Sequence, residues 1–210
     1  MFNEMMADEL SITWVGGDQD LRNKTLATIS SQASMPLTFS GNIASPFDAL
    51  QIMKMGFERV CITSAYLQNP TIASEISGHI GRSSVVLKIP VRSDGRGWQV
   101  WSWQRSRPSG LTLETLLRGF SSEHVGEIVL VSVDKNGMRS GIDKSLSRVL
   151  GQLKGVQKGY EGGVSSEQDV ADLWGAGVDA VYSTSYLMLF GQFEAPLIDY
   201  PTFGHERYLE

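Results

Sequence analysis

Glycine, threonine and serine recur in this chain in a pattern that could bind phosphate groups. The segment that begins at Gly41 reappears at Gly162, and the same offset of 121 (162 − 41) places Thr63–Ser64 on Thr184–Ser185. In each copy a glycine turn and a Thr-Ser pair follow apolar stretches. Backbone N–H groups and hydroxyls at such strand ends, next to a helix start, bind anions well. The two copies therefore predict two phosphate sites, although glycine and serine could also serve only as turns and caps.

The repeat predicts two copies of a strand–helix–strand unit. In each copy an apolar strand ends in glycine, and Ser45 or Ser166 follows as a helix N-cap. Gly56 or Gly177 then ends the helix, and a second apolar strand ends in the Thr-Ser pair. An offset that is kept over about 25 residues without a gap is hard to obtain by chance and is typical of an internally duplicated fold.

The rest of the chain also alternates between strand-like and helix-like stretches. Strands are predicted at Leu10–Val15, Pro36–Phe39, Arg59–Ile62, Val85–Val91, Glu127–Val133, Val156–Tyr160 and Ala180–Ser183. Helices are predicted at Asp18–Gln32, Ser45–Met55, Pro70–Ile80, Leu111–Phe120, Lys144–Leu153 and Ser166–Trp174. Because the strands are apolar throughout and separated by helices, they favour a parallel sheet covered on both faces. Linkers are short, so residues 1–210 are predicted to form a single α/β domain.

Composition narrows the function classes. The 210 residues carry a net charge of −5, which argues against a nucleic-acid partner. Tryptophans and arginines between 92 and 107 could stack on bases, but the alternating WQVWSWQ after Asp94–Gly95 favours a β-hairpin. No apolar run approaches the roughly 20 residues of a membrane span, and Met1–Leu10 lacks the apolar stretch of a signal peptide. The only cysteine, Cys61, allows no disulfide within the chain, and the cytoplasm is the expected location.

Five motifs, in order and spacing, resemble the cyclase subunit of imidazole glycerol phosphate synthase, the HisF-type branch of the HisA/HisF histidine-biosynthesis barrels. They are ADEL at Ala7, GNI at Gly41, VCITSAYLQNP at Val60, GEIVLVSVDKNGMRSGID at Gly126 and EGGVSSEQD at Glu161. The resemblance implies a (βα)8 TIM barrel with an ancestral half-barrel repeat. The repeat places the partner of the Val85 strand before the first residue of the chain. A first βα unit is therefore expected to be missing, which leaves seven parallel strands and a slot between those at Leu10 and Ala180.

The same resemblance implies a function. Family members take ammonia from a partner glutamine amidotransferase, a HisH-like glutaminase, at the barrel bottom and use it at the top face on a phosphorylated small-molecule substrate. The ending SYLMLFGQFEAPLIDYP, from Ser185, is most similar to HisF-like paralogues of surface-polysaccharide (O-antigen) loci, which implies a role in sugar amidation. Two alternatives stay open: a working cyclase, which is a lyase of histidine biosynthesis, and a non-catalytic scaffold for the glutaminase.

Carried over residue by residue, the resemblance implies two phosphate sites and a depleted catalytic centre. One phosphate site would use Gly162, Gly163, Thr184 and Ser185, and the other would use Asn42, Thr63, Ser64, Asn136 and Gly137. Of the family's two catalytic aspartates, one belongs to the absent first strand and the other is replaced by Pro90. Trp14 stands where the family has a further carboxylate. Asp134, at a strand end, is the remaining catalytic candidate, but one carboxylate cannot be both acid and base.

Charged residues at the strand starts resemble the family's ammonia gate. Glu9, Arg59 and Glu127 match in charge three of the four residues that ring the family's ammonia entrance, and Glu58 aligns with an acid near the glutaminase contact. Such charges can instead pair only to stabilise the bottom of a barrel. No cofactor is expected, and no metal site is expected because the three histidines lack the spacing of metal ligands.

Overall fold

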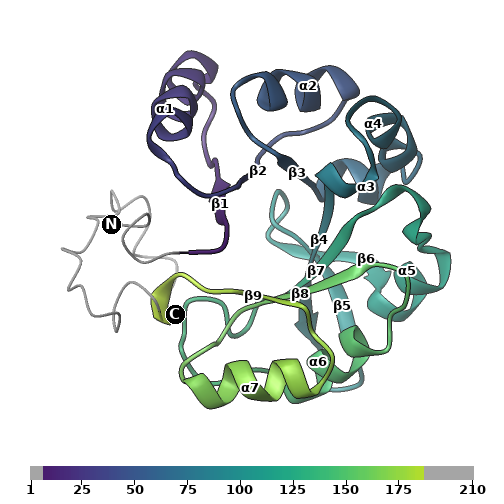
Figure 1. Ribbon diagram of the computed structural model, residues 1–210. Helices are drawn as coiled ribbons and strands as arrows, with labels where there is room; N and C mark the ends of the chain where they lie inside the picture. The colour runs from purple at the N-terminus through teal and green to yellow at the C-terminus, as the bar shows by residue number, and fades with distance from the viewer. Residues whose placement is uncertain (1–6, 187–210) are drawn as a thin grey trace.

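The computed structural model describes residues 7–186 and shows an α/β fold of the TIM-barrel type. Seven parallel strands follow one another around a common axis in the order β1, β2, β3, β4, β7, β8, β9, with helices outside them (Figure 1). Their bounds, in that order, are Leu10–Thr13, Leu37–Ser40, Arg59–Ile62, Val85–Ser93, Glu127–Ser132, Gln157–Glu161 and Ala180–Tyr182. Within the described residues β1 and β9 are not paired with each other. The seven predicted parallel strands are confirmed, with the sheet open between the first and the last.

The helices follow the predicted order, with one additional helix and with bounds that differ from the predicted ones by at most two residues. Their bounds are Gln19–Gln32 for α1, Pro46–Lys54 for α2, Ile72–Ile80 for α4, Leu113–Gly119 for α5, Lys144–Gly151 for α6 and Glu167–Gly175 for α7. The sequence does not predict the short helix α3, Ser64–Gln68, that directly follows β3. Helix α5 starts two residues later than predicted because Thr112 is its N-cap, with the Thr112 side chain accepting a hydrogen bond from Thr115 N.

A three-stranded antiparallel extension leaves the barrel after β4. β5 (Trp98–Ser102) pairs with the end of β4, and β6 (Arg107–Thr112) pairs with β5. The Asp94 carboxylate closes the first turn, since its Oδ1 accepts hydrogen bonds from Arg96 N and Gly97 N, both at 2.9 Å. The predicted hairpin is confirmed, and β6 takes up the residues just before α5.

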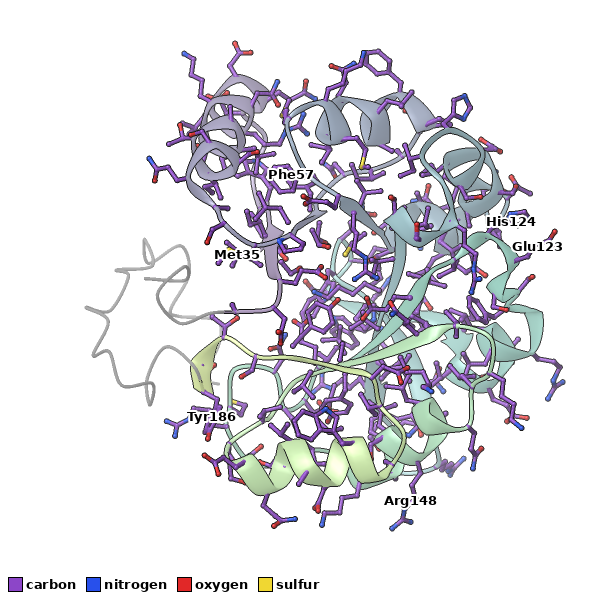
Figure 2. The ribbon with its side chains drawn as sticks, viewed as in Figure 1. Met35, Phe57, Glu123, His124, Arg148 and Tyr186 are labelled. Carbon is purple, nitrogen blue, oxygen red and sulfur yellow. The ribbon has the colours of Figure 1, made fainter. Side chains whose placement is uncertain are left out.

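Strand alternation divides the buried side chains into two groups. The larger cluster joins strand residues such as Leu87, Ile128 and Tyr160 to apolar residues of the surrounding helices. The smaller cluster contains only strand residues and lines the inside of the barrel: Cys61, Val86, Val129 and Val131, with Tyr182 packed against them. Side chains fill both the inside of the ring of strands and the space between strands and helices (Figure 2). The polar residues that face inward are therefore held between packed layers.

The internal repeat is present in the backbone. The N-cap residues of α2 and α7 have nearly the same dihedral angles: φ −150° and ψ 161° at Ser45, φ −153° and ψ 162° at Ser166. Each serine side chain accepts a hydrogen bond from the backbone N of an aspartate, Asp48 or Asp169, at 3.2 Å. The glycine that ends each helix, at 56 or 177, has a positive φ of 93° or 85°. The duplication read from the sequence is therefore a duplication of local geometry.

Candidate functional site

Three predicted gate residues meet at the amino ends of the strands. Arg59, the first residue of β3, contacts Glu9 through Nη1 at 3.0 Å and Glu127, the first residue of β7, through Nη2 at 2.5 Å. The second carboxylate oxygen of each acid also accepts a hydrogen bond. Glu9 Oε1 accepts from Thr38 Oγ1, and Glu127 Oε1 accepts from Tyr182 Oη at 3.0 Å. We call Glu9, Arg59 and Glu127 the charged ring; that it admits ammonia stays a prediction.

The charged ring is largely removed from water. The Glu127 side chain is only 1% exposed, and burial raises its pKa although Arg59 opposes the rise. For Arg59, burial alone would lower the pKa, but the carboxylates of Glu127 and Glu9 outweigh this and raise it. The guanidinium therefore stays charged and holds two like charges together. Removing it would leave Glu127 buried beside a single neutral donor.

A second ion pair, which sequence reasoning missed, lies further up inside the barrel. Lys88 Nζ lies 2.6 Å from Glu161 Oε2 and 5.7 Å from the centre of the Tyr182 ring. Burial alone would lower the pKa of Lys88, but Glu161 raises it, so the amine stays protonated. Burial raises the pKa of the neighbouring Cys61 thiol to about 12, with Lys88 opposing the shift. The available signal was a lone lysine at an inward position of the otherwise apolar run Val85–Val91 of β4.

Tyr182 contacts both the charged ring and the Lys88–Glu161 ion pair. Its hydroxyl donates to Glu127 of the charged ring, and its ring lies under the Lys88 ammonium. A route along the barrel axis from the strand starts to the strand ends would pass these groups in turn.

The catalytic candidate Asp134 is held against the hairpin. Its Oδ1 lies 2.7 Å from Arg92 Nε, and its Oδ2 accepts from Ser93 N at 3.2 Å. The Arg92 guanidinium also lies 5.1 Å from the Trp101 ring centre. Asp134 thus has a clear structural partner, and a catalytic role for it stays a prediction.

Two residues stand where the resemblance implies carboxylates, and neither Pro90 nor Trp14 can act as a proton-transferring acid or base. Pro90 is buried in β4 and is in register with Val131, which in turn is in register with Glu161. Glu161 is therefore a carboxylate at the level of Pro90, two strands away on β8, and it is already paired with Lys88. Trp14, just after β1, packs against the outer core.

A pocket of about 520 Å³ at the carboxyl ends of β2 and β3 brings together three predicted phosphate ligands, Asn42, Thr63 and Ser64. None of their side chains hydrogen-bonds to another residue in the described part of the chain. Asn136 and Gly137 do not line this pocket; they follow β7, and Asn136 Nδ2 donates to Glu161 Oε1 at 3.4 Å. The structure therefore gathers part of the predicted set, and phosphate binding stays a prediction.

The second predicted phosphate site lies at the start of α7. Gly162 and Gly163 have φ of 114° and 81°, and an added Cβ would come within 2.7 Å of Ser132 O or 2.4 Å of Gly141 O. These glycines are thus required by packing whether or not an anion binds. Thr184–Ser185 follows β9, with Thr184 exposed and Ser185 half-buried.

The described residues offer neither a cluster of metal ligands nor a membrane-spanning helix. Between residues 7 and 186, no group of three or more His, Cys, Asp or Glu side chains could hold a metal ion. In the same part of the chain, no helix is long and apolar enough to cross a membrane.

Comparison with known proteins adds two findings. Residues 1–194 match the family described as histidine biosynthesis protein. A protein of Leptospira interrogans, which carries the provisional name imidazole glycerol phosphate synthase subunit HisF, is 27% identical over 207 residues. That alignment covers 96% of this chain and 82% of the relative.

Proposed function

The chain belongs to the histidine biosynthesis protein family, and we propose that it is a HisF-like synthase subunit that accepts ammonia from a partner glutamine amidotransferase. Its substrate is a phosphorylated small molecule, and its role is sugar amidation in surface-polysaccharide synthesis in the cytoplasm. The named relative supports the HisF-like part of this proposal. The sequence from Ser185 onward supports the sugar part; beyond Tyr186 it lies outside the described residues.

The observation that carries the proposal is the charged ring at the strand starts. Burying a carboxylate such as Glu127 is costly, and a buried ion pair is often no more stable than apolar residues of similar volume. A stable barrel therefore does not need Glu9, Arg59 and Glu127 in its interior. These three charged residues would have a function if the ring faced a glutaminase and allowed ammonia to pass.

The top face favours this role over a working cyclase. Acid–base catalysis needs groups that give and take protons at the substrate, and Pro90 can do neither. Asp134 is tied to Arg92, and Glu161 is tied to Lys88. The cyclase alternative predicts imidazole glycerol phosphate formation from free ammonia. We expect none, and measurable turnover would promote that alternative.

The proposal is tested by measuring glutamine hydrolysis by a HisH-type glutaminase from the same organism, with and without this chain. We expect the chain to bind the glutaminase and to raise its rate by about tenfold, a typical coupling between two sites. Glu9→Gln removes one charge from the ring while keeping its shape, and it should abolish most of this increase. A chain that neither binds the glutaminase nor changes its rate would contradict the proposal.

A matched control is available on α5. Glu114 and Arg118 form an exposed ion pair, so Glu114→Gln makes the same chemical change away from the ring. This variant should leave both binding and glutamine hydrolysis unchanged. If the chain raises glutaminase activity but Glu9→Gln behaves like Glu114→Gln, the ring is structural and the scaffold alternative is favoured.

A further inference from the structure

A buried ion pair crosses the inside of the barrel beyond the charged ring. Lys88 lies on β4 and Glu161 on β8, and β7 lies between these two strands. Their charged ends are 2.6 Å apart, and the two side chains are only 14% and 21% exposed. Nothing in the family match or in the named relative assigns a role to this pair.

Strand register places the pair one inward layer away from the charged ring. On β7, Glu127 is in register with Val86, and Val129 is in register with Lys88. Side chains two residues apart on a strand face the same side, and two residues span about 6.6 Å. Tyr182 joins the layers, since its hydroxyl donates to Glu127 and its ring centre lies 5.7 Å from Lys88 Nζ. A molecule that passes the ring along the barrel axis therefore reaches the Lys88 ammonium next.

A buried hydroxyl beside the ring indicates that a small polar molecule fits there. Leu10 and Ile12 pack against the larger apolar cluster, so Ser11 between them faces the inside of the barrel. Ser11 Oγ is buried and has no hydrogen-bond partner among residues 7–186. Its register partner, Thr38, donates to Glu9 of the ring. Buried hydroxyls are usually hydrogen-bonded, and a molecule of the size of water or ammonia would satisfy this one.

The ion pair also suits ammonia chemically. Neutral ammonia carries a lone pair and N–H groups, so it can accept a hydrogen bond from the Lys88 ammonium and donate one to the Glu161 carboxylate. Burial alone would lower the pKa of Lys88, but the Glu161 carboxylate raises it, so Lys88 stays protonated. A second cation beside Lys88 would be repelled, which favours ammonia over ammonium.

The same pair closes the way to the carboxyl ends of β4, β7 and β8. Glu161 is the last residue of β8, and its other oxygen accepts from Asn136 Nδ2 at 3.4 Å. The buried strand residues of the smaller cluster pack around the inside of the barrel at this level. Passage therefore requires Lys88 and Glu161 to separate, and the packed side chains leave room only for a very small molecule.

We propose that Lys88 and Glu161 form an inner gate, which receives neutral ammonia from the charged ring and keeps larger amines out. The inner gate deepens the proposed function, on which it rests for the entry of ammonia at the ring. It adds a second selective step inside the barrel, made by two residues to which the family resemblance assigns no role.

The test is hydrogen exchange of the Lys88 side-chain ammonium, measured by nuclear magnetic resonance on the full chain alone. This group exchanges its protons with water when a free base reaches it. Ammonia and trimethylamine are compared as bases at one pH and one free-base concentration. We expect ammonia to speed the exchange of Lys88 about tenfold more than trimethylamine does. The Lys88→Met variant identifies the signal by its loss.

Lys158 is a matched internal control. Its side chain is 17% exposed and pairs with Asp179 at 3.3 Å. It faces away from the barrel interior, because a side chain on the neighbouring Gly159 would meet Glu127 Oε1. The two amines should speed the exchange of Lys158 to a similar degree.

Three results with the parent chain would overturn the proposal. The first is an equal effect of the two amines on Lys88, and the second is no effect of ammonia on it. The third is a Lys88 signal that exchanges too fast to observe, because water would then reach the pair freely.

Two substitutions locate the gate and its entry. Glu161→Gln breaks the ion pair and keeps its shape, so trimethylamine should then speed Lys88 exchange nearly as much as ammonia does. Asp179→Asn makes the matched change at Lys158 and should leave Lys88 unaffected. Ser11→Val places methyl groups beside the ring and should remove most of the ammonia effect on Lys88. Unchanged selectivity in Glu161→Gln would contradict the gate, and an unchanged ammonia effect in Ser11→Val would contradict entry from the ring.

The experiment needs no glutaminase. Size-selective exchange at Lys88 without any effect of the chain on a glutaminase would remove the proposed function and leave the inner gate as a property of the barrel. Glutaminase coupling without size-selective exchange would keep the proposed function and remove the inner gate.

Discussion

At the scale of single residues, the most unusual feature is charge inside a barrel. Arg59 holds Glu9 and Glu127 together at the strand starts, and Lys88 meets Glu161 further up. Each ion is paired, and Tyr182 contacts both layers. Pairing reduces the cost of burial but does not remove it, so breaking one member of a pair matters more than replacing both.

The first prediction concerns Arg59. Arg59→Ala leaves the Glu127 carboxylate, 1% exposed, with Tyr182 Oη as its remaining side-chain donor among the described residues, and we expect a loss of about 3–5 kcal/mol in the free energy of unfolding. The double variant Arg59→Met with Glu127→Gln removes both charges and should recover most of that loss. Urea unfolding followed by circular dichroism measures both. A single variant as stable as the parent would show that the ring carries little structural energy.

At the scale of elements, the two repeat units differ in the hydrogen bonds that the aspartate at the start of each helix accepts. In the first, Asp48 Oδ2 accepts from Ala44 N and Ser45 Oγ, at 3.1 and 2.8 Å. In the second, Asp169 Oδ2 accepts hydrogen bonds from Ser165 N, Ser165 Oγ and Ser166 N. Its Oδ1 also accepts from Ile142 N at 3.4 Å. Asp169 therefore ties the start of α7 to the loop that precedes α6, whereas Asp48 serves mainly its own helix.

The second prediction follows from this difference. Asp169→Asn should lower the free energy of unfolding by about 1 kcal/mol at pH 7, and Asp48→Asn by less. Burial alone would raise the pKa of Asp169, but hydrogen bonds from Ser165, Ile142 and Ser166 hold it below its ordinary value. A lowered folded pKa contributes stability above the unfolded pKa, about 3.9, that is lost as pH falls through the folded pKa.

Stability measurements by urea unfolding between pH 3 and 7 check this dependence. The gap between the parent and Asp169→Asn should be full at pH 7 and should shrink below about pH 4. A gap that stays constant down to pH 3 would mean that the carboxylate charge is not what stabilises the start of α7.

The elements were the most predictable part of the molecule. Apolar strands bounded by turns, and a repeat that fixes the helix caps, predict the ends of the barrel strands to within about one residue. The exceptions are the carboxyl ends of β1 and β4, which lie at Thr13 and Ser93 rather than at Val15 and Val91. The three-strand extension was only half predicted, because β6 has no apolar alternation and continues directly into the Thr112 cap. Helix α3 is too short to show a helical period.

The candidate site was less predictable, for a physical reason. The charged ring could be predicted because its members lie at the start of a strand, or directly before it in the case of Glu9, where a charged residue next to an apolar run is easy to notice. The Lys88–Glu161 pair depends on the register of three strands: Val129 matches Lys88 on β4, and Val131 matches Glu161 on β8. The contribution of Trp103 to the pocket depends on where the turn between β5 and β6 lies relative to the ends of β2 and β3, which no local pattern specifies.

At the scale of the whole molecule, one barrel presents different chemistry at its two ends. The charged ring lies at the amino ends of the strands, and the pocket with Trp103 lies at the carboxyl ends. The Lys88–Glu161 pair and Tyr182 lie between them. Any coupling of the two ends has to act through this packed interior. It therefore requires that the strands fold as a single domain.

The last prediction is that the chain unfolds in one cooperative transition, because a single domain over residues 1–210 is so far a prediction from the sequence. The larger buried cluster runs continuously from Leu26 on α1 to Val178 after α7, and the strands pair in one sheet. Shared core and shared strand pairing favour one cooperative transition. In urea, the far-ultraviolet circular dichroism and the tryptophan fluorescence of the full chain should therefore change together, at one midpoint. Two separated midpoints would show that the half-barrels unfold independently, with the β4–β7 junction as the place where they part.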